Sequence, residues 1–165
     1  MDAYDAMMAR RTIRQFKRDE VGEATIRRML EAGAAAPTND HMRDWDFVIV
    51  SSAEKRIELL DAIGGAWSES RVAAWLDGWA DDERQRAVYF DAVPIQRKML
   101  LEAPLLLIPV YDQRGDLLKP ESLSSLNAFA SIWCCIENIL VAAAAEGVAH
   151  TLRIPFEAER PHIKK

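Results

Sequence analysis

The sequence has few cysteines, no excess of positive charge and no segment typical of export. Its two cysteines, Cys134 and Cys135, are adjacent, so they cannot form an ordinary structural disulfide and lack the spacing of a metal site. We expect both to pack in the core, and we predict no metal. The formal net charge is −5, whereas a broad nucleic-acid interface needs an excess of Lys and Arg. Nucleic acid is therefore not an expected partner.

Membrane segments and several catalytic motifs are also lacking. The amino terminus shows no charged stretch followed by an apolar one, and no uninterrupted apolar run reaches the roughly 20 residues of a membrane helix. Gly-x-Ser-x-Gly, His-Glu-x-x-His and Gly-x-Gly-x-x-Gly are absent from the sequence. We expect a cytoplasmic protein with no membrane partner, no side-chain nucleophile and no Rossmann nucleotide site.

A basic cluster near the amino terminus stands out against this acidic background. Arg10, Arg11, Thr12 and Arg14 place three guanidinium groups and a hydroxyl within five residues. Because the planar fork of Arg matches phosphate oxygens two at a time, the cluster suits a terminal phosphate on a cofactor. A solvated basic face is the competing interpretation.

The remaining pattern predicts an α+β fold in which helices are interrupted by three short strands. Half of the 165 residues are apolar, which is enough to bury the core of one domain. Helices are expected over 2–10 and 22–36, from Ser51 or Ser52 up to Gly64-Gly65, and over 122–146; strands are expected over 45–50, 104–111 and 148–154. The near-continuous apolar run in 104–111 predicts a central strand covered on both faces.

The helix predicted over 122–146 is apolar almost all round, which is typical of a helix buried on every side. Since 165 residues supply few other elements to surround it, we expect a homodimer with this helix at the interface. Glu137 and Asn138 should then be hydrogen-bonded in a dry setting, with the capping of a neighbouring loop as the default role.

The segment 66–101 is rich in tryptophan and charge. Trp67, Trp75 and Trp79 are spaced by four or eight residues, which predicts one helical face. Packing on the domain or on a second subunit is one interpretation, and a lid that covers a planar ligand is the other.

Three separated pieces together resemble the nitroreductase family of FMN-dependent oxidoreductases. Residues 10–16 are similar to its Arg-Arg-Ser-Ile-Arg-x-Phe signature, and residues 36–47 resemble Ala-Pro-Ser-x-x-Asn-x-Gln-Pro-Trp-x-Phe. The third piece is the helix end over 137–148. Thr12 and Thr38 keep the hydroxyls, whereas His41, Arg43 and Asp44 depart from the usual Asn, Gln and Pro.

The resemblance implies a single nitroreductase-like domain over 1–165, short at the carboxyl terminus. It implies a mixed β-sheet flanked by helices, with the long central helix buried at a dimer interface and 66–101 as a helical lid or dimer-contact insertion. Two sites would lie across the subunit boundary, because the family's 36–47 loop comes from the other subunit. Members of the family usually continue for some tens of residues past the point where this chain ends. That part adds a further strand and a basic residue that also holds the flavin phosphate.

FMN is the implied cofactor and NAD(P)H the implied co-substrate, with the chemistry at flavin N5 and ping-pong kinetics. The acceptor would be a nitroaromatic, a quinone or a similar small planar molecule. A reductive dehalogenase-like enzyme and a non-catalytic flavin-binding dimeric module are the alternatives. The implied cofactor contacts are Arg10, Arg11, Thr12, Arg14, Pro37, Thr38, Asn39, His150, Thr151 and Leu152, and the candidate substrate contacts are His41, Trp67 and Trp75. For His150, Thr151 and His41, an ordinary strand or loop residue is the competing interpretation.

Overall fold

The computed structural model describes residues 1–61, 67–113, 115–156, 159 and 163. The chain divides into two compact units. The first unit comprises Met1–Ile13, Asp19–Val50 and Leu105–Thr151, and the second comprises Arg14–Arg18, Ser51–Pro104 and Leu152–Lys165. The expected single domain over 1–165 stays a prediction.

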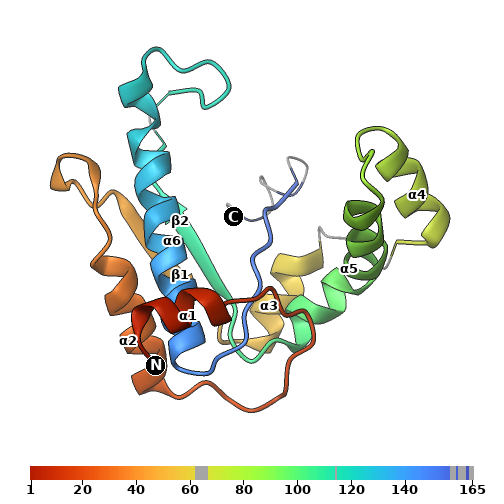
Figure 1. Ribbon diagram of the computed structural model, residues 1–165, viewed down its shortest axis with the longest axis horizontal. Helices are drawn as coiled ribbons and strands as arrows, with labels where there is room; N and C mark the ends of the chain where they lie inside the picture. The colour runs from red at the N-terminus through yellow and green to blue at the C-terminus, as the bar shows by residue number, and fades with distance from the viewer. Residues whose placement is uncertain (62–66, 114, 157–158, 160–162, 164–165) are drawn as a thin grey trace. The chain divides into compact units, whose positions relative to one another are not determined.

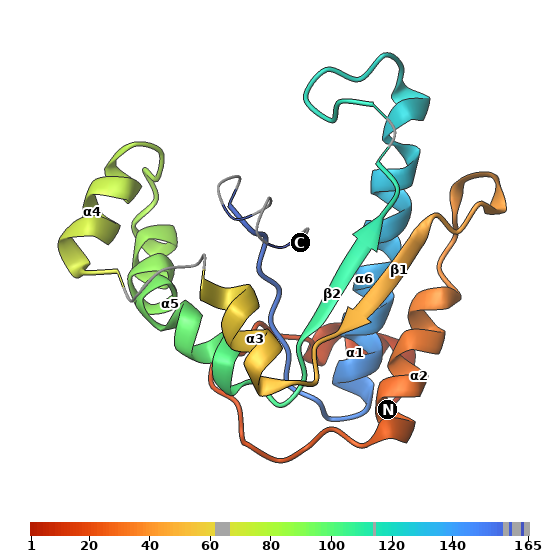
Figure 2. The same ribbon diagram turned by 180° about the vertical axis from the view of Figure 1, so that it is seen from behind.

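The first unit is built around one long helix, α6 (Asn127–Ala145), which packs against α1, α2 and β2. Figure 1 shows α2 alongside α6, and Figure 2 shows the two strands lying across α6 on another side. The fold is α+β, as expected. The other elements of this unit are α1 (Ala3–Ala9), α2 (Glu23–Ala34), the 3₁₀ turns η1 (Asn39–His41) and η3 (Leu123–Leu126), and the strands β1 (Trp45–Ile49) and β2 (Leu107–Tyr111).

Local signals place several helix ends where the sequence predicts them. Asp2 caps α1 by accepting a hydrogen bond from the Asp5 backbone N–H at 2.8 Å, which satisfies a donor that has no partner within the helix. Later in the chain, α6 stops before Gly147, whose φ of 72° is costly for residues with a Cβ. Gly64 and Gly65, the expected end of another helix, lie outside the described residues.

The strands depart from the expectation. β1 and β2 pair antiparallel, with Trp45 opposite Tyr111 and Ile49 opposite Leu107. Within the described residues β2 has β1 as its only neighbouring strand, so its predicted place as a central strand is wrong here. The predicted third strand over 148–154 is also absent from the described chain. In this segment the backbone makes one isolated parallel bridge, between Thr12 and His150. No described segment pairs with it over a greater length.

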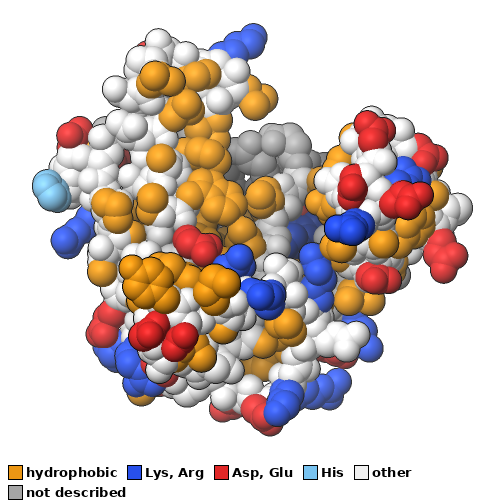
Figure 3. Space-filling view, viewed as in Figure 1, with side chains coloured by type: hydrophobic (Ala, Val, Ile, Leu, Met, Phe, Trp, Pro, Cys, Tyr) orange, Lys and Arg blue, Asp and Glu red, His pale blue; other side chains and the backbone are white. Residues whose placement is uncertain are grey.

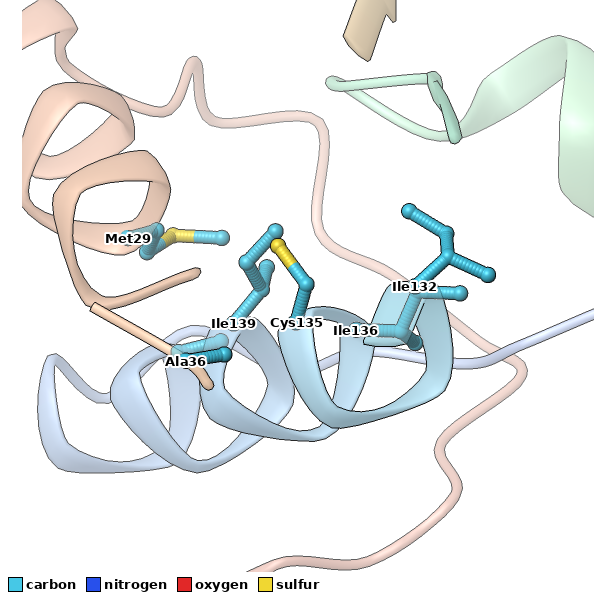
Figure 4. Close-up of a cluster of buried hydrophobic side chains, with 7 residues drawn as sticks. Met29, Ala36, Ile132, Cys135, Ile136 and Ile139 are labelled. Carbon is cyan, nitrogen blue, oxygen red and sulfur yellow. The ribbon is translucent and has the colours of Figure 1, made fainter. Parts of the chain in front are cut away.

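The core of this unit fills the space between α2 and α6 (Figure 4). Met29 of α2 meets Cys135 and Ile139 of α6, and burial raises the pKa of the Cys135 thiol to about 11. The prediction that both cysteines are buried is wrong for Cys134, which is exposed. Adjacent residues in a helix point about 100° apart, so only one of the two faces α2.

The predicted all-round burial of α6 is not met within one chain. Phe129, Cys134 and Glu137 are exposed, and Figure 3 shows apolar side chains gathered on the surface over α6 and α1. The side chain of Glu137 is 57% exposed in the single chain, so its expected dry setting at a dimer interface stays a prediction. Asn138 is hydrogen-bonded, as expected, since its Nδ2 donates to the Ala32 carbonyl at 3.0 Å, but this partner lies in the last turn of α2 and not in a loop.

In the part of the chain that the structure describes, the helix Leu123–Ala145 is long and apolar enough to cross a membrane by length and composition alone, although no such segment was expected from the sequence. The core helix of a soluble protein passes the same test. In the structure this helix packs against α2 and β2. The absence of a membrane partner stays a prediction.

The second unit is helical in its described part, with α3 (Ala53–Leu60), α4 (Glu69–Asp77) and α5 (Glu83–Glu102). Val72 and Leu76 are fully buried and pack with Ala80 and Val93. Arg56 extends from α3 to donate to the Ala103 carbonyl at the end of α5, where helix carbonyls lack partners within the helix. The role of 66–101 as a lid or dimer contact stays a prediction.

An ion pair connects α2 to the end of α6. Arg28 meets Glu146 through two contacts, Nε to Oε1 at 2.8 Å and Nη2 to Oε2 at 2.6 Å. These hydrogen bonds lower the pKa of the Glu146 carboxyl and raise the pKa of the Arg28 guanidinium. The pair therefore makes the stability of the first unit sensitive to acid.

We expect Glu146→Gln to remove this acid-sensitive contribution. Above the ordinary carboxyl value of 4.5 the ion pair stabilises the folded state in full. As the pH falls from there through the lowered pKa of the folded state, the carboxylate is protonated and the contribution is lost. Urea denaturation over a pH series should therefore show a stability gap between wild type and variant that closes at low pH. Glu23→Gln, which breaks an exposed pair within α2, is the control, and a gap independent of pH would contradict the prediction.

Candidate functional site

The basic cluster begins where α1 ends. Arg11 turns back over the helix end, and its Nη1 donates to the carbonyls of Met8 and Arg10, each at 2.7 Å. Arg10 places its Nε 3.2 Å from Oε1 of Glu137 on α6, with 34% of its side chain exposed. Thr12 is exposed beside them. The two guanidinium groups are thereby held by contacts to α1 and α6, with the exposed Thr12 next in the chain.

His150 lies against this cluster through the backbone. The Ile13 N–H donates to the His150 carbonyl at 2.9 Å, next to the Thr12–His150 bridge. The imidazole Nδ1 is 3.3 Å from the Val148 carbonyl, whereas its Nε2 is buried without a hydrogen-bond partner in the described part of the chain. A buried polar atom without a partner is costly, so this nitrogen marks a place where an added group would be stabilised.

The loop 38–44 forms a second feature of the same unit. Asp40, His41 and Arg43 have φ values of 48°, 55° and 51°. The left-handed region costs residues with a Cβ about 1–2 kcal/mol each, less for Asp, so the loop stores strain. Asn39 holds the loop to α6: its N–H donates to Ser131 Oγ at 3.1 Å.

A small cavity of about 80 Å³ lies between this loop and the start of α6. Pockets that enclose a drug-sized ligand are typically several hundred Å³, so this cavity alone does not enclose a flavin ring. The residues that line it are Thr38, Asn39, Met42, Arg43, Asp44, Trp45, Ser124, Ser125, Ala128 and Ser131.

Loop 38–44 and the basic cluster contact α6 at different positions. The loop is bound at Ser131 and the basic cluster at Glu137, six residues apart, which is about 9 Å along the helix and a turn of about 240° around it. Ser131 is buried and Glu137 exposed, in agreement with two different faces. The structure therefore groups Arg10, Arg11, Thr12 and His150, with Thr151 adjoining, and separately groups Pro37, Thr38, Asn39 and His41.

Four predicted site residues belong to the second unit. Arg14 is partly buried and Leu152 is 41% exposed. Trp75 packs edge-on against Trp67, with ring centroids 5.8 Å apart, and also against Trp79. Because α4 spans Glu69–Asp77, Trp67 and Trp79 lie beyond its ends and the predicted single helical face is wrong. Substrate binding by Trp67 and Trp75 stays a prediction.

Sequence reasoning missed Asn127 and Ser131, the two α6 residues that hold the loop. Asn127 Nδ2 donates to Asn39 Oδ1 at 2.9 Å, and Ser131 Oγ donates to the Asn127 carbonyl at 2.8 Å. Their signal in the sequence was polar residues four apart on an otherwise apolar helix. Among the described residues no group of three His, Cys, Asp or Glu side chains could hold a metal ion.

A model of the nitroreductase family matches residues 7–164. The chain belongs to the nitroreductase family. Among related proteins, the 5,6-dimethylbenzimidazole synthase of Rhodospirillum rubrum is 27% identical over 151 residues, which cover 89% of this chain and 66% of that protein. The iodotyrosine deiodinase of Daphnia pulex is 25% identical over 105 residues, covering 64% of this chain and 33% of that protein.

A solved member of the nitroreductase family has the same fold. The crystal structure of a nitroreductase with bound FMN from Bacteroides fragilis has 25% sequence identity and a TM-score of 0.55, covering 90% of this chain and 67% of that chain. Matches to five curated relatives span 26% to 66% of those proteins' lengths, so the chain corresponds to less than two thirds of each.

The donors of Arg10 and Arg11 suit an anionic group. Arg10 uses only Nε in its ion pair and Arg11 only Nη1 in its carbonyl bonds, so within the described contacts their other N–H groups remain available. Phosphate and carboxylate groups are the anions that such forked donors match. The unpartnered Nε2 of His150 adds a further polar atom beside the same segment.

Proposed function

We propose that this protein is an FMN-dependent oxidoreductase that uses NAD(P)H to reduce a nitroaromatic, a quinone or a similar planar acceptor by a ping-pong mechanism. The observation that carries the proposal is the cluster of Arg10, Arg11 and Thr12 beside the unpartnered Nε2 of His150, in a chain of the nitroreductase family. When bound, FMN supplies the redox chemistry, accepting hydride from the nicotinamide and delivering electrons to the acceptor.

The chain's own residues hold and orient the cofactor. Arg10, Arg11 and Arg14 bind the phosphate with the Thr12 hydroxyl, because forked cationic donors and a neutral donor together match its oxygens. The backbone N–H groups of His150, Thr151 and Leu152 donate to the edge of the ring system. Fixed donors of this kind stabilise charge that develops during a reaction without reorganising.

The second half of the site comes from a second copy of the chain. Pro37, Thr38 and Asn39 sit on a different face of α6 from the basic cluster, so a single chain separates the two halves. The exposed apolar side of α6, with Phe129 and Cys134, offers a surface that a homodimer would bury. His41, Trp67 and Trp75 are the proposed contacts for the acceptor. The proposed location is the cytoplasm, where reduced nicotinamide is supplied.

A reductive dehalogenase-like enzyme is the second candidate, favoured by the similarity to the Daphnia pulex iodotyrosine deiodinase. The two candidates differ in the molecule that reoxidises the reduced protein, which is a nitroaromatic or quinone in one and a halogenated aromatic in the other. A flavin-binding dimer without turnover, the third candidate, would show no steady-state oxidation of NAD(P)H.

The proposal predicts that the purified protein, mixed with excess FMN and desalted, keeps the visible absorbance of bound flavin. Without oxygen, the same preparation should oxidise about one equivalent of NAD(P)H per bound flavin and continue only when a planar acceptor is added, because the two half-reactions alternate at one site. Protein that retains no flavin after reconstitution would refute the proposed cofactor. Flavin retention without NAD(P)H oxidation would refute the enzyme and support the binding module.

A further inference from the structure

Three residues of loop 38–44 adopt the left-handed backbone conformation, which must be stabilised by other contacts. Asp40, His41 and Arg43, all with a Cβ, have φ near 50° within four residues. Only Gly adopts this region freely, so an isolated segment of this sequence would favour other conformations. Something outside the loop must select this one.

Contacts from α6 converge on Asn39, immediately before the strained residues. Ser131 Oγ accepts from the Asn39 N–H at 3.1 Å, and Asn127 Nδ2 donates to Asn39 Oδ1 at 2.9 Å. Ser131 Oγ also donates to the Asn127 carbonyl at 2.8 Å, so its position is fixed in turn. Ser131 is buried, which makes each of these bonds costly to lose.

Asn39 passes this constraint along the loop. Its Nδ2 donates to Asp40 Oδ2 at 3.1 Å, and its carbonyl accepts from the Met42 N–H at 3.0 Å. The backbone bond spans the left-handed residues Asp40 and His41, and the side-chain bond holds the first of them. Fixing Asn39 by its backbone and its side chain therefore fixes the turn that follows.

We infer that Asn127 and Ser131 are positioning residues that select the left-handed conformation of loop 38–44 and so place Thr38, Asn39 and His41 for the cofactor and acceptor. The inference rests on the proposed function for its consequence, because that function assigns the loop to the flavin site. The structural part of the inference, that Asn127 and Ser131 fix the conformation of loop 38–44, does not depend on that function.

Amide hydrogen exchange on the FMN-free protein tests the structural part. Ser131→Ala and Asn127→Ala should each speed exchange in peptides covering 38–44 by about tenfold, with peptides from β1 and the second half of α6 unchanged. Asn138→Ala is the matched control, since it removes an α6 amide that bonds to the Ala32 carbonyl and leaves loop 38–44 untouched.

Unchanged exchange in 38–44, or an equal increase across every peptide of the first unit, would overturn the positioning role. FMN titrations then test its consequence, with about three- to tenfold weaker binding expected for both variants and wild-type binding for Asn138→Ala. A wild-type protein that binds no FMN refutes the proposed function, while the exchange result still decides whether Asn127 and Ser131 position the loop.

Discussion

Replacing Arg11 with alanine is expected to weaken FMN binding by about 10- to 100-fold. A hydrogen bond to a charged group contributes about 1.5–3 kcal/mol, and each 1.4 kcal/mol changes affinity tenfold. Arg11 has one nitrogen committed to the end of α1 and further N–H groups available for a phosphate. Titration of FMN, followed by quenching of its fluorescence, measures the change.

Two controls separate phosphate binding from a looser α1. Riboflavin lacks the phosphate, so Arg11→Ala should leave its affinity unchanged if the guanidinium binds that group, whereas a disordered helix end would weaken both ligands. Arg27→Ala removes an exposed guanidinium that pairs with Glu23 on α2 and should bind FMN like wild type. Equal FMN affinity for wild type and Arg11→Ala would remove Arg11 from the proposed phosphate site.

Gly33→Ala is expected to lower the free energy of unfolding by about 1–3 kcal/mol, although alanine is the better helix former. A Cβ at Gly33 would stand 2.7 Å from Cγ1 of Ile139 and 3.1 Å from Sγ of Cys135, in the tightest part of the packing between α2 and α6. Either the Ile139 side chain or the helices must move. Urea denaturation measures the loss, with Cys135 kept reduced.

A double-mutant cycle tests the physical cause. Ile139→Ala alone should lower the free energy of unfolding by about 2–5 kcal/mol, because Ile139 is 4% exposed and its truncation leaves a cavity. In that background Gly33→Ala should cost less than in wild type, since the added methyl fills vacated space. Gly22→Ala, where nothing lies within 4 Å of the new Cβ, controls for the change in backbone freedom. Additive effects at positions 33 and 139 would contradict close packing as the cause.

The names of the related proteins describe different chemistries. The R. rubrum relative is a benzimidazole synthase and the D. pulex relative a deiodinase. Loop 38–44 carries His41, Arg43 and Asp44 where the family signature has Asn, Gln and Pro. In our proposal, this loop is where substitutions would change the choice of acceptor without changing how FMN is held.

The sequence alone was sufficient for features that depend on near neighbours. The Asp2 cap of α1, the start of α3 after Ser52 and the stop at Gly147 each rest on one residue acting within a few positions along the chain. The ordered motifs at 10–16 and 36–47 likewise identified the family, which the match over 7–164 confirms. These signals act between residues close in the sequence, so they do not depend on how distant segments pack.

Only the tertiary structure decided features that depend on contacts between distant segments. It exposed Cys134 while burying Cys135, left β2 with one neighbouring strand in the described chain, and reduced the predicted third strand to the Thr12–His150 bridge. It also brought Asn39 to Ser131, 92 positions away, and left His150 Nε2 without a partner in the described chain. Periodicity shows that a side chain will be buried, but the identity of its neighbour is set by how the whole chain folds back on itself.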